Sequence, residues 1–250
     1  MEIASGIILG LVEGFTEFIP VSSTAHLILV SKLLGLKNEI LIVNSIVVQA
    51  ASVLALIFFF WKQDEKLSNF LKKKFLSQSL LCVLIFVVLA LLFEEIIKIY
   101  LFSLKGIVAG LVLGTLLLIG GVLSQTKSSN FGTITAIFIG FVQSLALIPG
   151  VSRSGAVIAA ALMCGMHLRE AVKFSFFQAL ILLSAAAFYE CCKSFSVIQD
   201  NLVLVLSSFS SALFSSYLAL GILYSLPNKR FFYIFIGYRI FLIIFLVNFL

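Results

Sequence analysis

The sequence predicts an all-α membrane protein with six transmembrane helices and two re-entrant helical hairpins, arranged as an inverted-topology repeat. Of its 250 residues, 62% are hydrophobic and 11% are charged, whereas a soluble domain carries about 25% charged residues. Several apolar runs reach the ~20 residues that span a bilayer. Two polar stretches, residues 13–26 and 149–155, interrupt the apolar sequence. Because a charge at the centre of a membrane helix costs about 2.5–3.5 kcal/mol, these stretches point to a functional site.

The chain begins MEIASGIILGLVEG, with an acidic residue where a secretory signal carries positive charge, so we expect this segment to stay in the folded protein. The four cysteines form no CxxC pair, and we expect neither a disulfide framework nor a structural zinc site. The six predicted spans are residues 40–61, 75–93, 106–123, 171–188, 202–226 and 231–250.

Charged loops set the predicted orientation of these spans. The net charge is +6, and much of the positive charge lies between the first two spans. By the positive-inside rule this loop is cytoplasmic, and its expected neighbours are anionic lipid headgroups rather than nucleic acid. Counting span by span then places the mixed-charge loop with Glu190, Lys193 and Asp200 outside. The lysines of the first loop are Lys62, Lys66, Lys72, Lys73 and Lys74.

Each polar stretch separates two apolar segments that are too short to span the bilayer. Residues 133–148 and 156–166 meet at Pro149-Gly150, which suits a hairpin that enters and leaves on one side. Residues 3–12 and 27–34 flank the first stretch in the same way. The alternative is a chain of eight to ten ordinary spans with proline kinks.

One hairpin followed by three spans makes one half of the chain, about residues 1–123, and the pattern recurs over residues 124–250. Because three is odd, the second half is inserted upside down relative to the first within a single membrane domain. A weak sequence echo, FIPVSS at 18–23 and IPGVSRS at 148–154, supports the repeat. Paired broken helices in inverted halves mark a predicted binding site.

Glu13 and Glu17 are four residues apart, so on a helix they project from one face about 6 Å apart. Two such carboxylates repel, and either one is protonated or a cation lies between them. A hard, oxygen-binding ion, Mg²⁺ or Ca²⁺, would also contact phosphate oxygens. Alternatively, the pair is structural and is satisfied by Arg153 or by serines.

Pro20 cannot continue the first helix, and Ser22, Ser23 and Thr24 follow where the next helix should begin. These hydroxyls are good helix caps, and they are also candidate contacts for a phosphate. His26 shares a helical face with Ser23, so its imidazole is a candidate acceptor for the proton of an attacking Ser23 hydroxyl. The alternative is a hydrogen-bonded structural histidine.

The second polar stretch, PGVSRSG, has the composition of a phosphate cradle. Its glycines would let the backbone approach a ligand, Ser152 and Ser154 would donate hydrogen bonds, and Arg153 supplies a two-pronged cation. It lacks the GxxxxGK[ST] pattern of a Walker loop. Arg153 could instead pair with Glu13 or Glu17. Arg239, within the last span, could equally make a second phosphate contact or a structural ion pair.

Two motifs, EGFTEFIPVSSTAH (13–26) and QSLALIPGVSRSG (143–155), together with FSF at 174–176 and Tyr238-Arg239, carry a resemblance that extends over essentially the whole chain. The chain resembles the undecaprenyl-diphosphatase family, bacterial membrane proteins associated with bacitracin resistance. The resemblance implies hydrolysis of undecaprenyl diphosphate to undecaprenyl phosphate and inorganic phosphate, which recycles the lipid carrier of peptidoglycan synthesis.

The resemblance also implies a divalent cation, a homodimer, and an inner-membrane location with the site facing the periplasm. Residue by residue, it points to Glu13 and Glu17 as the acidic pair, Ser23 as nucleophile, His26 as its partner, and Ser152, Arg153 and Ser154 as phosphate binders. A lipid-carrier flippase or transporter is the alternative function, because inverted repeats with broken helices are a transporter design. Whether Ser23 or a metal-bound water attacks phosphorus stays open.

Overall fold

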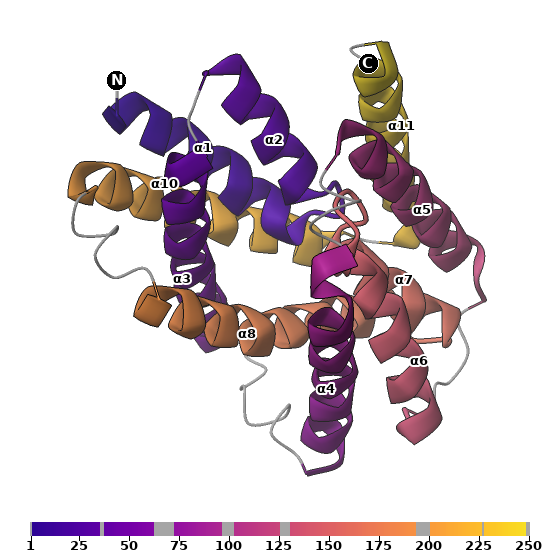
Figure 1. The fold of residues 1–250 in the computed structure, drawn as a ribbon. Coiled ribbons are helices and arrows are strands. Elements are labelled where there is room, and N and C mark those ends of the chain that lie inside the picture. The colour runs from indigo at the N-terminus through magenta and orange to yellow at the C-terminus, as the bar shows by residue number, and fades with distance from the viewer. Residues whose placement is uncertain are drawn as a thin grey trace. The chain divides into compact units, whose positions relative to one another are not determined.

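The computed structural model describes residues 2–35, 38–62, 73–96, 103–125, 131–193, 201–226 and 228–248. These ranges contain ten α-helices, two short 3-10 helices and no strand (Figure 1). Five of the described helical segments are long and apolar enough to cross a bilayer. The chain is therefore a multi-pass α-helical membrane protein, as the composition predicted.

These five segments coincide with five of the six predicted spans. The sixth prediction, residues 40–61, falls on α3 (Asn38–Lys62), whose side chains are described only from Val47 onward. Several charges that set the predicted orientation, Lys66, Lys72 and Asp200, lie outside the described residues. The spanning helices are α4 (Lys73–Ile96), α5 (Leu104–Leu123), α8 (Leu168–Lys193), α10 (Leu202–Ser225) and α11 (Phe232–Asn248), the last preceded by η4 (Lys229–Phe231).

Each of the two predicted hairpins is a pair of short helices that pack against each other. The first pair is α1 (Glu2–Phe18) and α2 (Ser23–Leu33). The second is α6 (Thr133–Ser144), extended by η3 (Leu145–Leu147), and α7 (Arg153–Met163). In the described residues three further helices follow each pair, α3 to α5 after the first and α8, α10 and α11 after the second, so the order of elements repeats along the chain. α1 is longer than predicted, because the helix continues past residue 12 through both carboxylates to Phe18.

The two breaks share an unusual backbone conformation. Ser22 has φ 75° and Ser152 has φ 72°, and they are the non-glycine residues with positive φ in the described chain. Each lies directly before a short helix and directly after a valine, Val21 or Val151. The echo between FIPVSS and IPGVSRS therefore extends to backbone geometry, at the same position of both motifs.

The chain forms two compact units, each assembled from several parts of the sequence. The first unit contains α1, α2, α3, the part of α8 from Ala179 onward, and most of α10. The second contains α4 to α7, the part of α8 up to Gln178, α11, and the break at Pro20–Ser22.

In the first unit, α1 packs against α10 through an interface of small residues. A glycine recurs on every turn of α1, and serine hydroxyls of α10 donate to the glycine carbonyls: Ser208 to Gly6 (3.1 Å), Ser215 to Gly10 (3.2 Å) and Ser216 to Gly14 (3.2 Å). A methyl group at Gly10 would lie 2.1 Å from Ser211 Oγ and 2.3 Å from Ser208 O. Close backbone approach of this kind holds helices together where the solvent is lipid.

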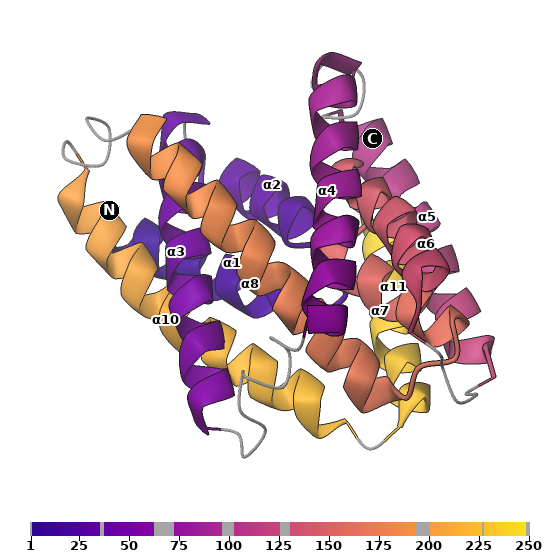
Figure 2. The same ribbon diagram turned by 90° about the horizontal axis from the view of Figure 1, so that it is seen from below.

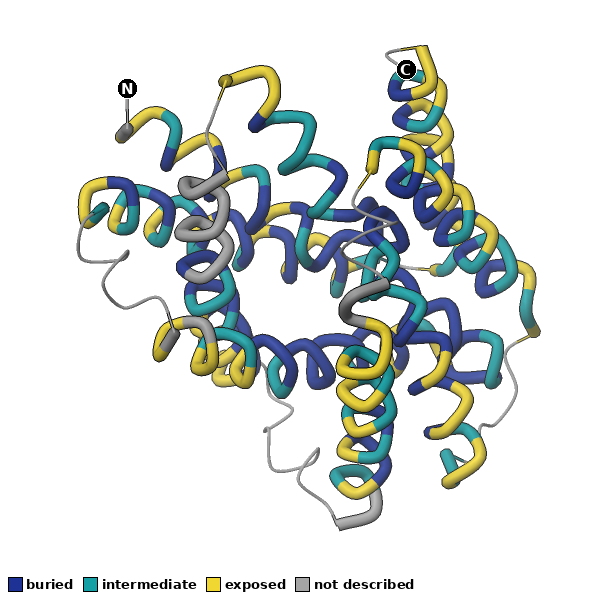
Figure 3. Tube along the Cα trace, in the orientation of Figure 1, coloured by how far each residue is buried: buried dark blue, intermediate teal, exposed yellow. Residues whose placement is uncertain are grey.

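In the second unit, α7 is buried along residues 154–162 (Figure 3), and α5, α6, α7 and α11 pack side by side (Figure 2). The turn at Pro149-Gly150 lies against the glycine face of α5. A Cβ at Gly150, where φ is 103°, would lie 2.3 Å from Ile107 O. The missing side chain of Gly150 thus admits the backbone of α5, while the predicted approach of the glycines of this motif to a ligand stays a prediction.

Candidate active site

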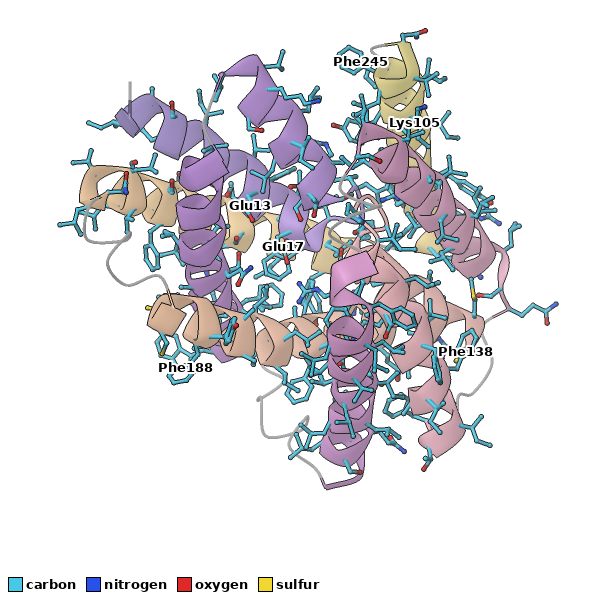
Figure 4. The ribbon with its side chains drawn as sticks, viewed as in Figure 1. Glu13, Glu17, Lys105, Phe138, Phe188 and Phe245 are labelled. Atoms are coloured by element: carbon cyan, nitrogen blue, oxygen red, sulfur yellow. The ribbon has the colours of Figure 1, made fainter. Side chains whose placement is uncertain are left out.

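Glu13 and Glu17 lie on successive turns near the C-terminal end of α1 (Figure 4). Glu13 is 7% exposed and Glu17 is half-buried. The glycine–serine interface places them there, because Gly10 and Gly14 hold this part of α1 against α10. The helical spacing predicted for the two carboxylates is confirmed.

The break after α1 returns the chain so that the first residue of α2 meets the end of α1. Ser23 Oγ donates a hydrogen bond of 2.9 Å to Glu17 Oε2. A carboxylate in this position orients the serine oxygen and can accept its proton. His26, the predicted acceptor, is half-buried further along α2. Its contact with Ser23 stays a prediction, and the observed partner of Ser23 is Glu17, in line with the alternative that serines satisfy the acidic pair.

The second motif forms the start of α7. Ser152 Oγ accepts a hydrogen bond from Gly155 N (3.3 Å), so Ser152 caps the helix. The hydroxyls of Ser152 and Ser154 lie 3.2 Å apart, with Ser154 buried and Arg153 half-buried at the first helical position. Backbone N–H groups at a helix start, hydroxyls and a guanidinium together form a set of donors suited to an anion.

In the described structure the guanidinium of Arg239 is bound by neutral oxygens in place of the suggested carboxylate, and the suggested phosphate contact stays a prediction. Arg239 is 0% exposed, and its guanidinium donates four hydrogen bonds to neutral oxygens within the second unit. An ion pair with a carboxylate and a contact with substrate were the expected alternatives. The acceptors are Thr115 Oγ1 (3.0 Å) and the carbonyls of Leu111 (3.0 Å), Gly150 (2.8 Å) and Pro20 (3.3 Å).

The donor chemistry of Glu13 and Glu17 fits a hard divalent cation in part. Within the described ranges, no three or more His, Cys, Asp or Glu side chains converge as a metal site. Two carboxylates give oxygen ligands of the kind that Mg²⁺ and Ca²⁺ prefer, and such ions commonly complete their coordination with water and substrate phosphate. The pair therefore suits a cation that binds together with a phosphate.

A cavity of about 720 Å³ lies between α3 and α10 in the first unit. Aromatic side chains dominate its lining, with Lys62 at one end of α3. None of the predicted site residues lines it. The other lining residues are Phe58, Trp61, Ser210, Leu213, Phe214 and Tyr217.

Comparison with known families accounts for the two motifs. A family model described as bacitracin resistance protein BacA matches residues 6–245. The chain belongs to this family. Among curated relatives, an undecaprenyl-diphosphatase of Nitrosospira multiformis is 35% identical over 94% of this chain and 90% of its own length. One of Pseudomonas putida strain W619 is 34% identical over 90% and 86%, and undecaprenyl-diphosphatase 2 of Shewanella oneidensis is 32% identical over 96% of both chains.

This BacA-family chain thus aligns with whole relatives and not with one segment of them. Both polar motifs fall inside the matched residues, and so do the glycine–serine interface from Gly6 onward and Arg239. The similarity therefore covers the candidate site and the helices that support it.

Proposed function

We propose that this chain hydrolyses undecaprenyl diphosphate to undecaprenyl phosphate and inorganic phosphate. The observation that carries the proposal is its similarity, over nearly the full length, to curated relatives named undecaprenyl-diphosphatase. The hydrogen bond from Ser23 to Glu17 adds chemical support, because a flippase needs groups that bind phosphate but no activated hydroxyl. The product is the lipid carrier of peptidoglycan synthesis, so the activity would support cell-wall synthesis and bacitracin resistance.

In the proposed reaction, Ser23 Oγ attacks the terminal phosphorus of the diphosphate. The bond from that phosphorus to the bridging oxygen breaks, and undecaprenyl phosphate leaves. The proton of Ser23 passes to Glu17, whose Oε2 lies 2.9 Å away, or to His26. Water then hydrolyses the phosphoseryl group, which releases inorganic phosphate and restores the hydroxyl.

The second motif supplies the charge that this step requires. Arg153 would bind the phosphate oxygens in a bidentate manner, and Ser152, Ser154 and the N–H groups that open α7 would complete the cradle. Ser22 and Thr24 are further candidate donors from the first motif. In phosphoryl transfer, catalysis rests mainly on positioning and charge neutralisation, and one arginine can contribute roughly 10³–10⁵ in rate.

Glu13 and Glu17 would hold a divalent cation, Mg²⁺ or Ca²⁺, whose charge offsets that of the phosphates when it is bound. EDTA should then abolish phosphate release, and added Mg²⁺ or Ca²⁺ should restore it. Glu13→Gln should raise the cation concentration needed for half-maximal rate, while the exposed Glu170→Gln serves as a matched control. Full activity in EDTA would contradict the cation assignment.

We place the protein in the bacterial inner membrane, with the site open to the periplasm, the polyprenyl tail among lipid and the apolar helices, and a homodimer as the assembly. The positive loop between the first two spans supports this orientation. The relatives' names favour hydrolysis over transport.

The decisive experiment is phosphate release from undecaprenyl diphosphate by the purified protein in detergent. The wild type should release phosphate, and Arg153→Ala should lower kcat/KM by roughly 10³-fold or more, with Arg153→Lys also strongly impaired because lysine cannot bind in a bidentate manner. Arg169→Ala, an exposed arginine of α8, is the matched control and should retain activity. If the wild type binds the substrate but releases no phosphate, the transporter alternative would be favoured. Normal turnover by Arg153→Ala would contradict the assignment of the second motif as the phosphate-binding site.

A further inference from the structure

Arg239 lies at the point where both helix breaks approach α5. Its Nε donates to Thr115 and its Nη2 to Leu111 O, which fixes the guanidinium against one turn of α5. The remaining two hydrogen bonds go to the breaks themselves, from Nη1 to Pro20 O and from Nη2 to Gly150 O. All of these residues belong to the second compact unit.

The two carbonyls occupy corresponding positions in the two motifs. Pro20 lies two residues before Ser22, and Gly150 lies two residues before Ser152. Among the described non-glycine residues, Ser22 and Ser152 are those with positive φ, a strained conformation that persists only where the surroundings impose it. One guanidinium therefore ties the equivalent peptide groups of two strained turns that are far apart in sequence.

The backbone of α5 and of the two breaks packs closely around the guanidinium. A Cβ at Gly114 would lie 2.3 Å from Arg239 Nη2, so α5 carries a glycine where the guanidinium passes. The breaks also contact each other directly, because a Cβ at Gly155 would lie 3.2 Å from Pro20 Cβ. With 0% exposure and four hydrogen bonds already made, Arg239 is not placed to bind a phosphate from solution.

We propose that Arg239 is a positioning residue that locks the two helix breaks to each other and to α5. It thereby fixes the starts of α2 and α7, where Ser23 and Arg153 stand. The inference that this lock serves turnover rests on the proposed hydrolysis. The lock itself is independent of any reaction, because it is a set of hydrogen bonds to backbone carbonyls.

The test is Arg239→Lys, because a single ammonium cannot reach four acceptors spread around a guanidinium fork. Hydrogen–deuterium exchange should rise severalfold at both breaks, in peptides covering residues 18–26 and 148–156. The kcat for phosphate release should fall about 10–100-fold, as expected for misplaced catalytic groups, while KM changes less than about threefold. Ile236→Val removes one methyl group from another buried side chain of α11 and keeps the guanidinium, so it should alter neither exchange at the breaks nor the kinetic constants kcat and KM.

The outcomes separate the lock from the reaction. Faster exchange at both breaks in Arg239→Lys, together with no phosphate release by the wild type, would support the lock and contradict the proposed hydrolysis. Unchanged exchange at the breaks in a folded Arg239→Lys protein would overturn the lock, even if hydrolysis is confirmed. A rise at one break only would also overturn it, and a loss expressed wholly in KM would overturn its role in turnover. Thr115→Val, which removes one acceptor on α5 and neither break contact, should have a smaller effect than Arg239→Lys on exchange and on kcat.

Discussion

Ser23 is the first residue of α2, and its hydroxyl donates a hydrogen bond to Glu17 of α1. The contact spans the break between the two helices, because α1 ends at Phe18. The break between them accounts for this contact. Pro20 stops the first helix, and the positive φ of Ser22 turns the chain so that Ser23 returns to the carboxylate. Two residues that are six apart in sequence thereby form one chemical unit.

If Ser23 and Glu17 act as this unit, their substitutions should not add. Ser23→Ala and the isosteric Glu17→Gln should each lower kcat for phosphate release by about 10²–10⁴-fold, since each removes a participant in proton transfer or attack. The double variant should be no slower than the worse single variant, because groups that act together lose their effect together. The test is the steady-state kcat of the three variants. If the fold-loss in kcat of the double variant equals the product of the two single losses, the residues act independently.

At the scale of helices, the small residues of α1 and α10 determine how closely α1 packs against α10. Gly10→Ala should destabilise the protein by about 1–3 kcal/mol, because the new methyl group meets the backbone oxygen of Ser208 at 2.3 Å. The matched control is Gly221→Ala, since nothing lies within 4 Å of a Cβ at that position of α10. That change should be neutral or should stabilise by about 0.5–1 kcal/mol through helix propensity.

Thermal unfolding in detergent, followed by size-exclusion chromatography, would compare the two variants with the wild type. Equal midpoints for Gly10→Ala and Gly221→Ala would show that α10 does not hold α1 closely. A lower midpoint in Gly10→Ala alone would show that the interface supports the helix carrying Glu13 and Glu17.

Periodicity and length predicted most of these helices, because a membrane helix must be apolar for about 20 residues and the two short pairs are visibly shorter. The sequence also predicted the helical face shared by Glu13 and Glu17. It could not predict the partners of Arg239, because backbone carbonyls carry no sequence signature and Pro20 is 219 residues away. Nor could it predict that the open side of Gly150 faces α5, since that helix lies far away in sequence.

At the scale of the whole molecule, the two sequence halves exchange helices. α10, from the second half, packs on α1 from the first, and α11 packs on α5. Arg239 of α11 is anchored on Leu111 and Thr115 of α5. Each compact unit therefore draws its core from both halves, and neither core can close until helices of both halves are inserted.

The orientation of the spans can be tested with the native cysteines. Cys191 and Cys192 are exposed at the end of α8, which the positive-inside count places outside, whereas Cys82 is buried. A membrane-impermeant maleimide should therefore label intact cells of a bacterial host whose outer membrane is permeabilised. The Cys191→Ser/Cys192→Ser double variant should lose this label, and the buried Cys82 should react only after denaturation. Labelling of the wild type only after inner-membrane lysis would invert the orientation, and with it the assignment of the site to the periplasmic face.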